Sequence, residues 1–152
     1  MSLSLPGAIV RTGLIAGTLD VLTAIIVYAV ILHKVTATRI LQGIASGVFG
    51  QQAFSGGTAM ALTGLVFHYI IAFAFTASYF LVYPHLPFLK RHPVPNALLY
   101  GILVWMIMNL VVLPLSRYPQ ATLRLGPSLL GMAILMVMIG LPVALRAHRY
   151  YR

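Results

Sequence analysis

Residues 125–145 read LGPSLLGMAILMVMIGLPVAL, a stretch without a single charged side chain. A helix of about 20 apolar residues is what crosses the hydrocarbon core of a bilayer. Residues 40–89 and 92–116 are equally free of charge, and residues 12–33 are interrupted only by Asp20. These runs predict four transmembrane helices, at about residues 9–32, 58–82, 96–115 and 127–145.

The composition of the whole chain favours a bilayer environment. Of its 152 residues, 61% are hydrophobic and 7% are charged, whereas a soluble domain carries roughly 25% charged residues. Ten Lys and Arg residues stand against one acidic residue, but they flank the apolar runs instead of forming a patch on a polar domain. We therefore expect an all-α integral membrane bundle in contact with lipid, and no binding of nucleic acid.

Residues 38–52 form a shorter segment between the first two spans. Thr38 is suited to cap a helix, and Ile40, Ile44 and Val48 then fall on one face of it. Three glycines in the segment weaken it as a free-standing helix. We expect an interfacial or re-entrant helix here and not a fifth span.

Four spans place both termini and the loop between spans two and three on one side of the membrane. Six basic residues lie on that side, namely Arg11, Lys90, Arg91, Arg146, Arg149 and Arg152, and four lie on the other, namely Lys34, Arg39, Arg117 and Arg124. The excess of positive charge predicts that both termini are cytoplasmic. The first span is longer than the core of a signal peptide, so we expect it to be retained.

Two further expectations concern the surface that faces lipid. Tyrosines near the predicted helix ends should act as interfacial anchors, namely Tyr28, Tyr79, Tyr83, Tyr100, Tyr118 and Tyr150. The fourth span contributes no polar group at mid-depth, which favours an outer position for it.

Asp20 is the only acidic residue in the chain and lies near the middle of the first span. An ionisable group there costs at least ~2.5 kcal/mol, so it needs a partner or a wet cavity. With a rise of about 1.5 Å per residue, His68 in the second span and Asn109 in the third fall within about two turns of its depth. The sequence thus predicts an intramembrane polar cluster of Asp20, His68 and Asn109.

The cluster has two interpretations. Its members can hydrogen-bond across helices and fix the packing, at about 0.6 kcal/mol for each bond. Asp20 and His68 can also form a proton or ion relay, because intramembrane carboxyl and imidazole groups mark such pathways. Arg39 is another candidate partner for Asp20, although its position favours a guanidinium that extends to the interface.

Small residues at four-residue spacing predict close packing of helices. The glycines in question are Gly13, Gly17, Gly43, Gly47 and Gly64. The first two lie on nearly the same face as Asp20, so a neighbouring helix can approach it there.

Catalysis and metal binding are not expected. The chain has no cysteine and one acidic residue, which leaves little from which to build an active site or a metal site. Haem, quinone or pigment binding at His68 is a third possibility, but the other histidines lie near helix ends or in loops. We expect no bound cofactor.

Three segments carry a resemblance to known proteins: RILQGIASG at residues 39–47, GLIAGTLD at residues 13–20 and HYIIAF at residues 68–73. With these segments the chain resembles small bacterial inner-membrane proteins of the YagU-like group. The resemblance covers most of the chain and implies four spans in a bacterial inner membrane. It implies no substrate and no catalytic residue.

The leading hypothesis is a non-enzymatic multi-pass protein that acts through helix packing, as a homo-oligomer or as an accessory subunit of a membrane complex. The alternative is a small channel, proton pathway or solute carrier centred on Asp20 and His68. A cofactor-binding membrane subunit is the third hypothesis.

Overall fold

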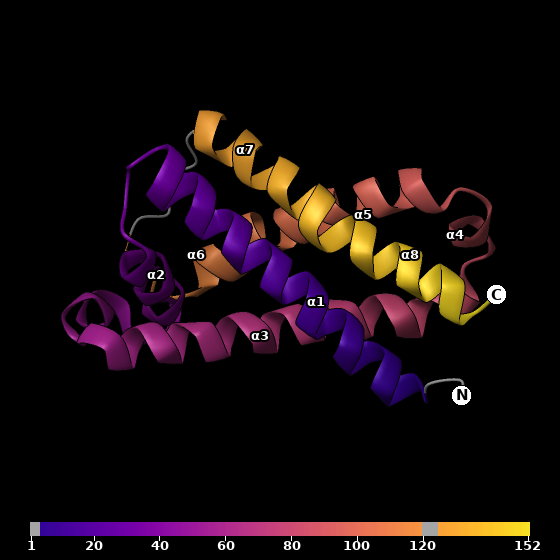
Figure 1. Cartoon of the computed structure of the whole chain (residues 1–152), viewed down its shortest axis with the longest axis horizontal. Helices are drawn as coiled ribbons and strands as arrows, with labels where there is room; N and C mark the ends of the chain where they lie inside the picture. Colours follow the sequence, from indigo (N-terminus) through magenta and orange to yellow (C-terminus); the bar gives the residue numbers. More distant parts are fainter. Residues whose placement is uncertain (1–3, 120–124) are drawn as a thin grey trace.

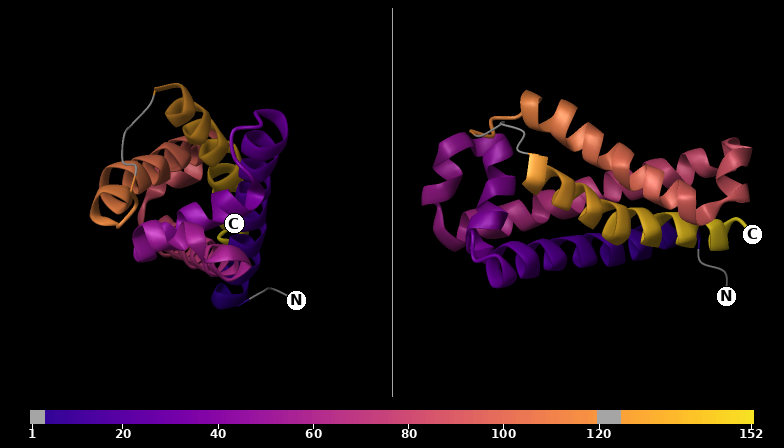
Figure 2. Two further views of the ribbon diagram at one scale, coloured as in Figure 1. Left: turned by 90° about the vertical axis from the view of Figure 1, so that its left-hand side faces the viewer. Right: turned by 90° about the horizontal axis from the view of Figure 1, so that it is seen from above.

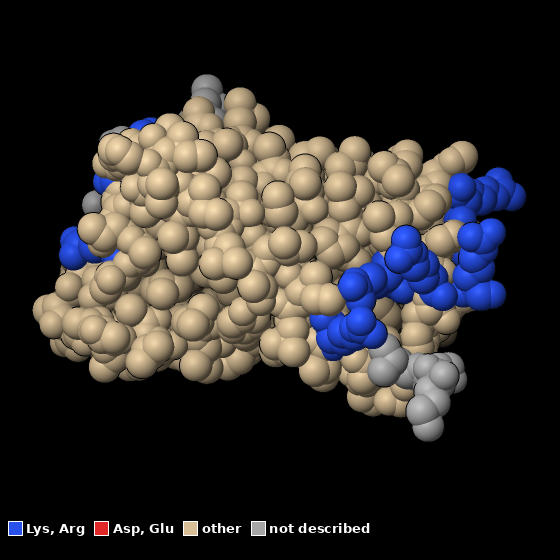
Figure 3. All heavy atoms as spheres, in the orientation of Figure 1, with Lys and Arg blue, Asp and Glu red and all other residues tan. Residues whose placement is uncertain are grey.

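The computed structural model describes residues 4–119 and 125–152, so that Arg124 lies outside the described part. In the described residues the chain forms helices and no strand. Four helices are long and apolar enough to cross a membrane, namely Leu5–Ile31, Gly57–His85, Pro93–Leu115 and Gly126–Tyr150. On the face drawn in Figure 3, Lys and Arg gather at the two ends and leave a broad uncharged band between them. These features are those of a multi-pass membrane protein.

Each span is built from one or more helical segments. The first comprises α1 (Leu5–Ile25) and η1 (Ile26–Ile31), and the second comprises α3 (Gly57–Val82) and η3 (Tyr83–His85). A short helix, α4 (Pro87–Arg91), leads to the third span, which comprises α5 (Pro93–Ile107), η4 (Met108–Val112) and α6 (Leu113–Leu115). The fourth comprises α7 (Leu125–Leu135), η5 (Met136–Gly140) and α8 (Leu141–Tyr150).

Prolines account for two of the three π-helical segments. Pro114 follows η4 and Pro142 follows η5, each as the second residue of the next α-helical segment. A proline ring cannot donate a backbone hydrogen bond and collides with the carbonyl four residues earlier, so the turn before it widens. The fourth span therefore widens directly before Pro142.

The spans alternate in direction, which places both termini and α4 at one end of the bundle (Figure 1). We call this the terminal end, and we call the opposite end, which carries α2 and α6, the α2 end. Figure 2 shows that the spans converge at the terminal end and diverge toward the α2 end. The buried core accordingly lies mainly in the terminal half, with Ala8, Ala16, Phe80, Ala97, Val143 and Ala147 among its members.

The segment between spans one and two is α2 (Ala37–Phe49), which is followed by η2 (Gly50–Ser55). Thr36 and not Thr38 caps α2, because Thr36 Oγ1 accepts a hydrogen bond of 3.2 Å from the Arg39 amide. The cap lies one residue before the helix, where its hydroxyl reaches the free amides of the first turn.

The buried face of α2 is not its apolar face. Gln42, Ala45 and Ser46 are buried, whereas Val48 is exposed. This face packs on α3, and Gln42 Nε2 donates a 3.0 Å hydrogen bond to the carbonyl of Gly57. Polar and small residues make this contact because they allow two backbones to approach closely.

The fourth span is not the outer helix that we expected, because it packs against both α1 and α5. Three residues of α8 are completely buried, namely Val143, Ala144 and Ala147. Gly140 faces the backbone of Ala97, and Gly101 faces the backbone of Met136, so a Cβ atom at either glycine would collide. Small residues, and not polar ones, therefore hold this span inside the bundle.

Candidate functional site

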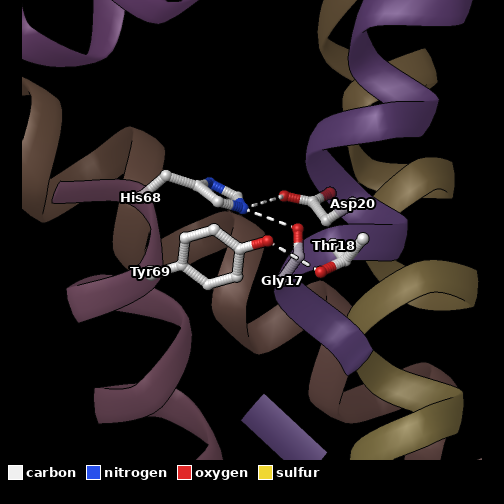
Figure 4. A network of polar contacts seen from close by, with 5 residues as sticks. All are labelled: Gly17, Thr18, Asp20, His68 and Tyr69. Atoms are coloured by element: carbon white, nitrogen blue, oxygen red, sulfur yellow. Dashed lines mark hydrogen bonds and ion pairs between the residues drawn. The ribbon is translucent and has the colours of Figure 1, made fainter. Parts of the chain in front are cut away.

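Asp20 on α1 meets His68 on α3 inside the bundle (Figure 4). Asp20 Oδ2 lies 4.0 Å from His68 Nε2, and the two side chains are 17% and 13% exposed. This is the only ion pair in the described part of the chain. His68 Nε2 also lies 2.8 Å from the Gly17 carbonyl oxygen, and because a carbonyl only accepts, Nε2 carries a proton and donates it.

A second hydrogen bond joins the same two helices beside this pair. Thr18 Oγ1 and Tyr69 Oη are 2.7 Å apart, so two successive residues of α3 bind α1 (Figure 4). The absence of a side chain at Gly17 allows the close packing that these bonds need. A Cβ atom at this position would lie 3.1 Å from the Ala72 and Tyr69 side chains. The Thr18–Tyr69 contact was not predicted, although Tyr69 is adjacent to His68 in the sequence.

Gly13 and Gly64 likewise lie at close contacts between helices. A Cβ atom at Gly13 would overlap the Phe73 ring, and one at Gly64 would overlap the Leu41 carbonyl. Both glycines thus act in packing within one chain, as small residues do at membrane helix interfaces.

A cavity of about 530 Å³, which is widely open to the outside of the bundle, extends from Asp20 toward the α2 end between the first, third and fourth spans. Polar side chains make up much of its wall, namely Asp20, Tyr28, Trp105, Asn109, Tyr118 and Ser128. One water molecule occupies roughly 30 Å³ in the liquid, so this volume is many times larger than a single water molecule needs. The only acidic side chain of the chain therefore stands at the inner end of a space that can hold water.

Asn109 lines this cavity but does not join the Asp20–His68 pair by any hydrogen bond within the described residues. Its Nδ2 donates instead to the Trp105 carbonyl, one turn earlier on the same helix, at 2.9 Å. The predicted cluster is thus a pair, with Asn109 on the wall of the cavity beside it.

Arg39 does not pair with Asp20. Its guanidinium carbon lies 4.3 Å from the centre of the Phe54 ring, which is a cation–π contact. Both residues line a separate apolar groove of about 930 Å³ between α2, α3 and the third span. Because α2 packs on α3 and hardly touches α1, Arg39 is directed into this groove.

Gly43 and Gly47 face the same groove. A Cβ atom at Gly43 would meet nothing within 4 Å, so Gly43 is not a packing glycine, contrary to our prediction. A Cβ atom at Gly47 would lie 3.7 Å from the Ser116 side chain, which is an ordinary contact.

Aromatic side chains close the terminal half of the bundle. Tyr79, Phe80 and Tyr83 are 4%, 0% and 1% exposed, so the two tyrosines are core residues and not interfacial anchors. Tyr83 Oη lies 2.7 Å from His148 Nδ1, and Tyr151 Oη donates a 2.9 Å bond to the Phe80 carbonyl. Burial raises the pKa of the Tyr151 hydroxyl, so this group keeps its proton at neutral pH.

The two halves of the bundle thus differ in access to Asp20. The α2 half contains a polar cavity that ends at Asp20, and the terminal half is packed.

Comparison with known proteins does not add a family to this description. The chain matches no protein-family model, no curated protein and no solved structure. The resemblance to YagU-like proteins therefore stays a prediction, and the site is interpreted from its own geometry.

Proposed function

We propose that this multi-pass membrane protein conducts protons across a bilayer by way of Asp20. The observation that supports the proposal is the position of the only acidic side chain, at the inner end of a polar cavity and 4.0 Å from an imidazole nitrogen. Carboxyl groups are costly at this depth, and those that occur there usually serve ion or proton pathways.

A proton suits this site better than a metal cation. Calcium and magnesium ions need about six oxygen ligands, several of them from protein carboxylates or carbonyls. In the described residues no three His, Asp or Glu side chains gather around one point. A carboxyl group beside an imidazole can instead pass a single proton between them.

The packing hypothesis has lost part of its motivation. Gly13, Gly17 and Gly64 contact residues of the same chain, so they give no reason to expect a second copy. A role as a homo-oligomer or accessory subunit stays a prediction. Cofactor binding at His68 is less favoured than it is from the sequence alone, because Nε2 is already hydrogen-bonded to the Gly17 carbonyl.

We further propose that the protein lies in a bacterial inner membrane with its terminal end in the cytoplasm. Six Lys and Arg residues belong to the terminal end, against Lys34, Arg39 and Arg117 among the described residues of the α2 end. Positive charge favours the cytoplasmic side. The cavity then opens to the outside, and a membrane potential that is negative inside would draw protons from it toward the cytoplasm.

Proton flux into vesicles tests the proposal. Purified protein is placed in liposomes that contain a pH-sensitive dye, and a potassium gradient with valinomycin makes the interior negative. Wild-type vesicles should acidify faster than empty ones, and Asp20→Asn should return the rate to that of empty vesicles.

The matched control is Thr63→Val, because the Thr63 hydroxyl bonds only the Ala59 carbonyl of its own helix. This variant should conduct as the wild type does. Asp20→Asn protein that elutes as the wild type does on size exclusion and still conducts would rule out Asp20 as the site.

A further inference from the structure

Two hydroxyl groups in the packed terminal half have no partner in the protein. Thr76 Oγ1 and Tyr79 Oη are both buried, and neither forms a hydrogen bond within the described residues. Thr76 is 0% exposed and Tyr79 is 4% exposed. A buried hydroxyl without a partner destabilises the fold, because it has lost its hydrogen bonds to water. An ordered internal water molecule can satisfy such groups.

Both hydroxyls lie on the face of α3 that begins at His68. His68, Ala72, Thr76, Tyr79 and Tyr83 recur at intervals of three or four residues, which places them along one side of the helix. The last four are buried, and the stripe extends for about 22 Å at 1.5 Å per residue. It therefore leads from the depth of Asp20 to the terminal end.

The α1 residues one and two turns before Asp20 are also suited to a polar path. Ala16 and Thr12, four and eight residues before Asp20, are 0% and 2% exposed. Thr12 adds a further hydroxyl on the α1 face that carries Asp20.

The stripe ends at a titratable group near the terminal surface. Tyr83 Oη is 2.7 Å from His148 Nδ1 on α8, and the side chain of His148 is only partly buried. Arg146 and Arg149 flank His148 in the sequence. A proton that reaches His148 can therefore leave to the solvent at this end.

We propose that this face of α3 is the second half of the proton path. It joins the Asp20–His68 pair to His148 through the hydroxyls of Thr76, Tyr79 and Tyr83 and through water held by the two unpartnered hydroxyls. The inference rests on the proposed function. Each hydroxyl or water accepts one proton while it donates its own to the next acceptor, so one proton enters, one leaves and no group is consumed.

Removal of the two hydroxyls tests the path. The double variant Thr76→Val, Tyr79→Phe deletes only the polar atoms and keeps the shape of the core. Proton flux in the vesicle assay should fall at least about tenfold, the ratio that an added barrier of about 1.4 kcal/mol produces. The control is Thr63→Val, which deletes a hydroxyl of the same helix that lies off the stripe and donates to the Ala59 carbonyl; it should conduct as the wild type does.

Thermal stability provides a second and independent measurement. If the two hydroxyls hold water, the double variant loses those hydrogen bonds and melts below the wild type. A melting temperature above that of the wild type would show that the hydroxyls were simply unsatisfied, and it would overturn the proposal.

The flux results separate this inference from the proposed function. Normal flux in the double variant together with background flux in Asp20→Asn would overturn the path and leave Asp20 as the proton site. Wild-type vesicles that acidify no faster than empty ones would overturn both.

Discussion

Gly64→Ala should weaken the attachment of α2 to α3. A Cβ atom at residue 64 would stand 2.7 Å from the Leu41 carbonyl carbon and 3.2 Å from the Ala45 amide nitrogen, and it would overlap the Leu41 carbonyl oxygen. Ordinary contacts begin at 3.4 Å, so α2 has to retreat by at least about 0.7 Å. The obstacle is backbone, which cannot rotate away as a flexible side chain can.

Two opposing effects determine how far Gly64→Ala changes the free energy of unfolding. Forcing one methyl group into a packed contact costs about 1–3 kcal/mol. Replacing glycine by alanine inside a helix gains about 0.5–1 kcal/mol of helix propensity. Gly43→Ala in α2 has the same gain without the collision, because nothing lies within 4 Å of its Cβ position. The free energies of unfolding of the two variants should therefore differ by about 1–3 kcal/mol, which is the steric contribution alone.

Denaturant unfolding of the two purified variants in detergent micelles, followed by circular dichroism, measures this difference. Gly43→Ala should be as stable as the wild type or more stable, and Gly64→Ala should be less stable. If Gly64→Ala unfolds at the same denaturant concentration as Gly43→Ala, α2 does not pack on α3 in the way that the structure describes.

Two further experiments test local hydrogen bonds. Thr36→Ala should cost about 1 kcal/mol and speed amide exchange in the first turn of α2, whereas Thr38→Ala should do neither, because only Thr36 Oγ1 caps the helix. A double-mutant cycle of Thr18→Val and Tyr69→Phe should give a coupling of about 0.6 kcal/mol, the average for membrane helices; a coupling of zero would contradict the 2.7 Å bond between these hydroxyls.

The number of spans could be predicted from charge alone. A charged side chain in the hydrocarbon core is costly, so long uncharged runs mark the spans directly. Helix ends were less predictable, because several residues near an end can serve as caps. Thr36 and Thr38 both precede the apolar face of α2, and only the path of the backbone decides between them.

The inward faces of the helices could not be predicted in the same way. In water, apolar residues mark the buried face of a helix, but in lipid both faces are apolar and the signal disappears. Tyr79 and Tyr83 were expected to be interfacial anchors because they lie near helix ends. The fourth span was expected to be outermost because it has no polar group at mid-depth. Glycines carried the information instead, since Gly101 and Gly140 lie where the third and fourth spans touch.

The candidate site was partly predictable from depth. Counting residues along the spans placed Asp20 and His68 within two turns, and they lie 4.0 Å apart. The polar cavity could not be predicted, because it depends on how far the spans diverge at the α2 end (Figure 2). The direction of Arg39 depends in turn on which side of α3 carries α2.

Cysteine labelling can establish whether water reaches Asp20 from the α2 end. The chain has no cysteine of its own, so single substitutions can be made in the wild-type background. Ala24→Cys would place a thiol on the cavity wall one turn from Asp20, and Leu22→Cys would place one on the outer face of the same helix, where Leu22 is 50% exposed. We expect a membrane-impermeant thiol reagent to modify Ala24→Cys from the α2 side alone and to leave Leu22→Cys unmodified. An Ala24→Cys thiol that stays unmodified from that side, or that reacts from the terminal side, would contradict a water-filled cavity that leads from the α2 end to Asp20.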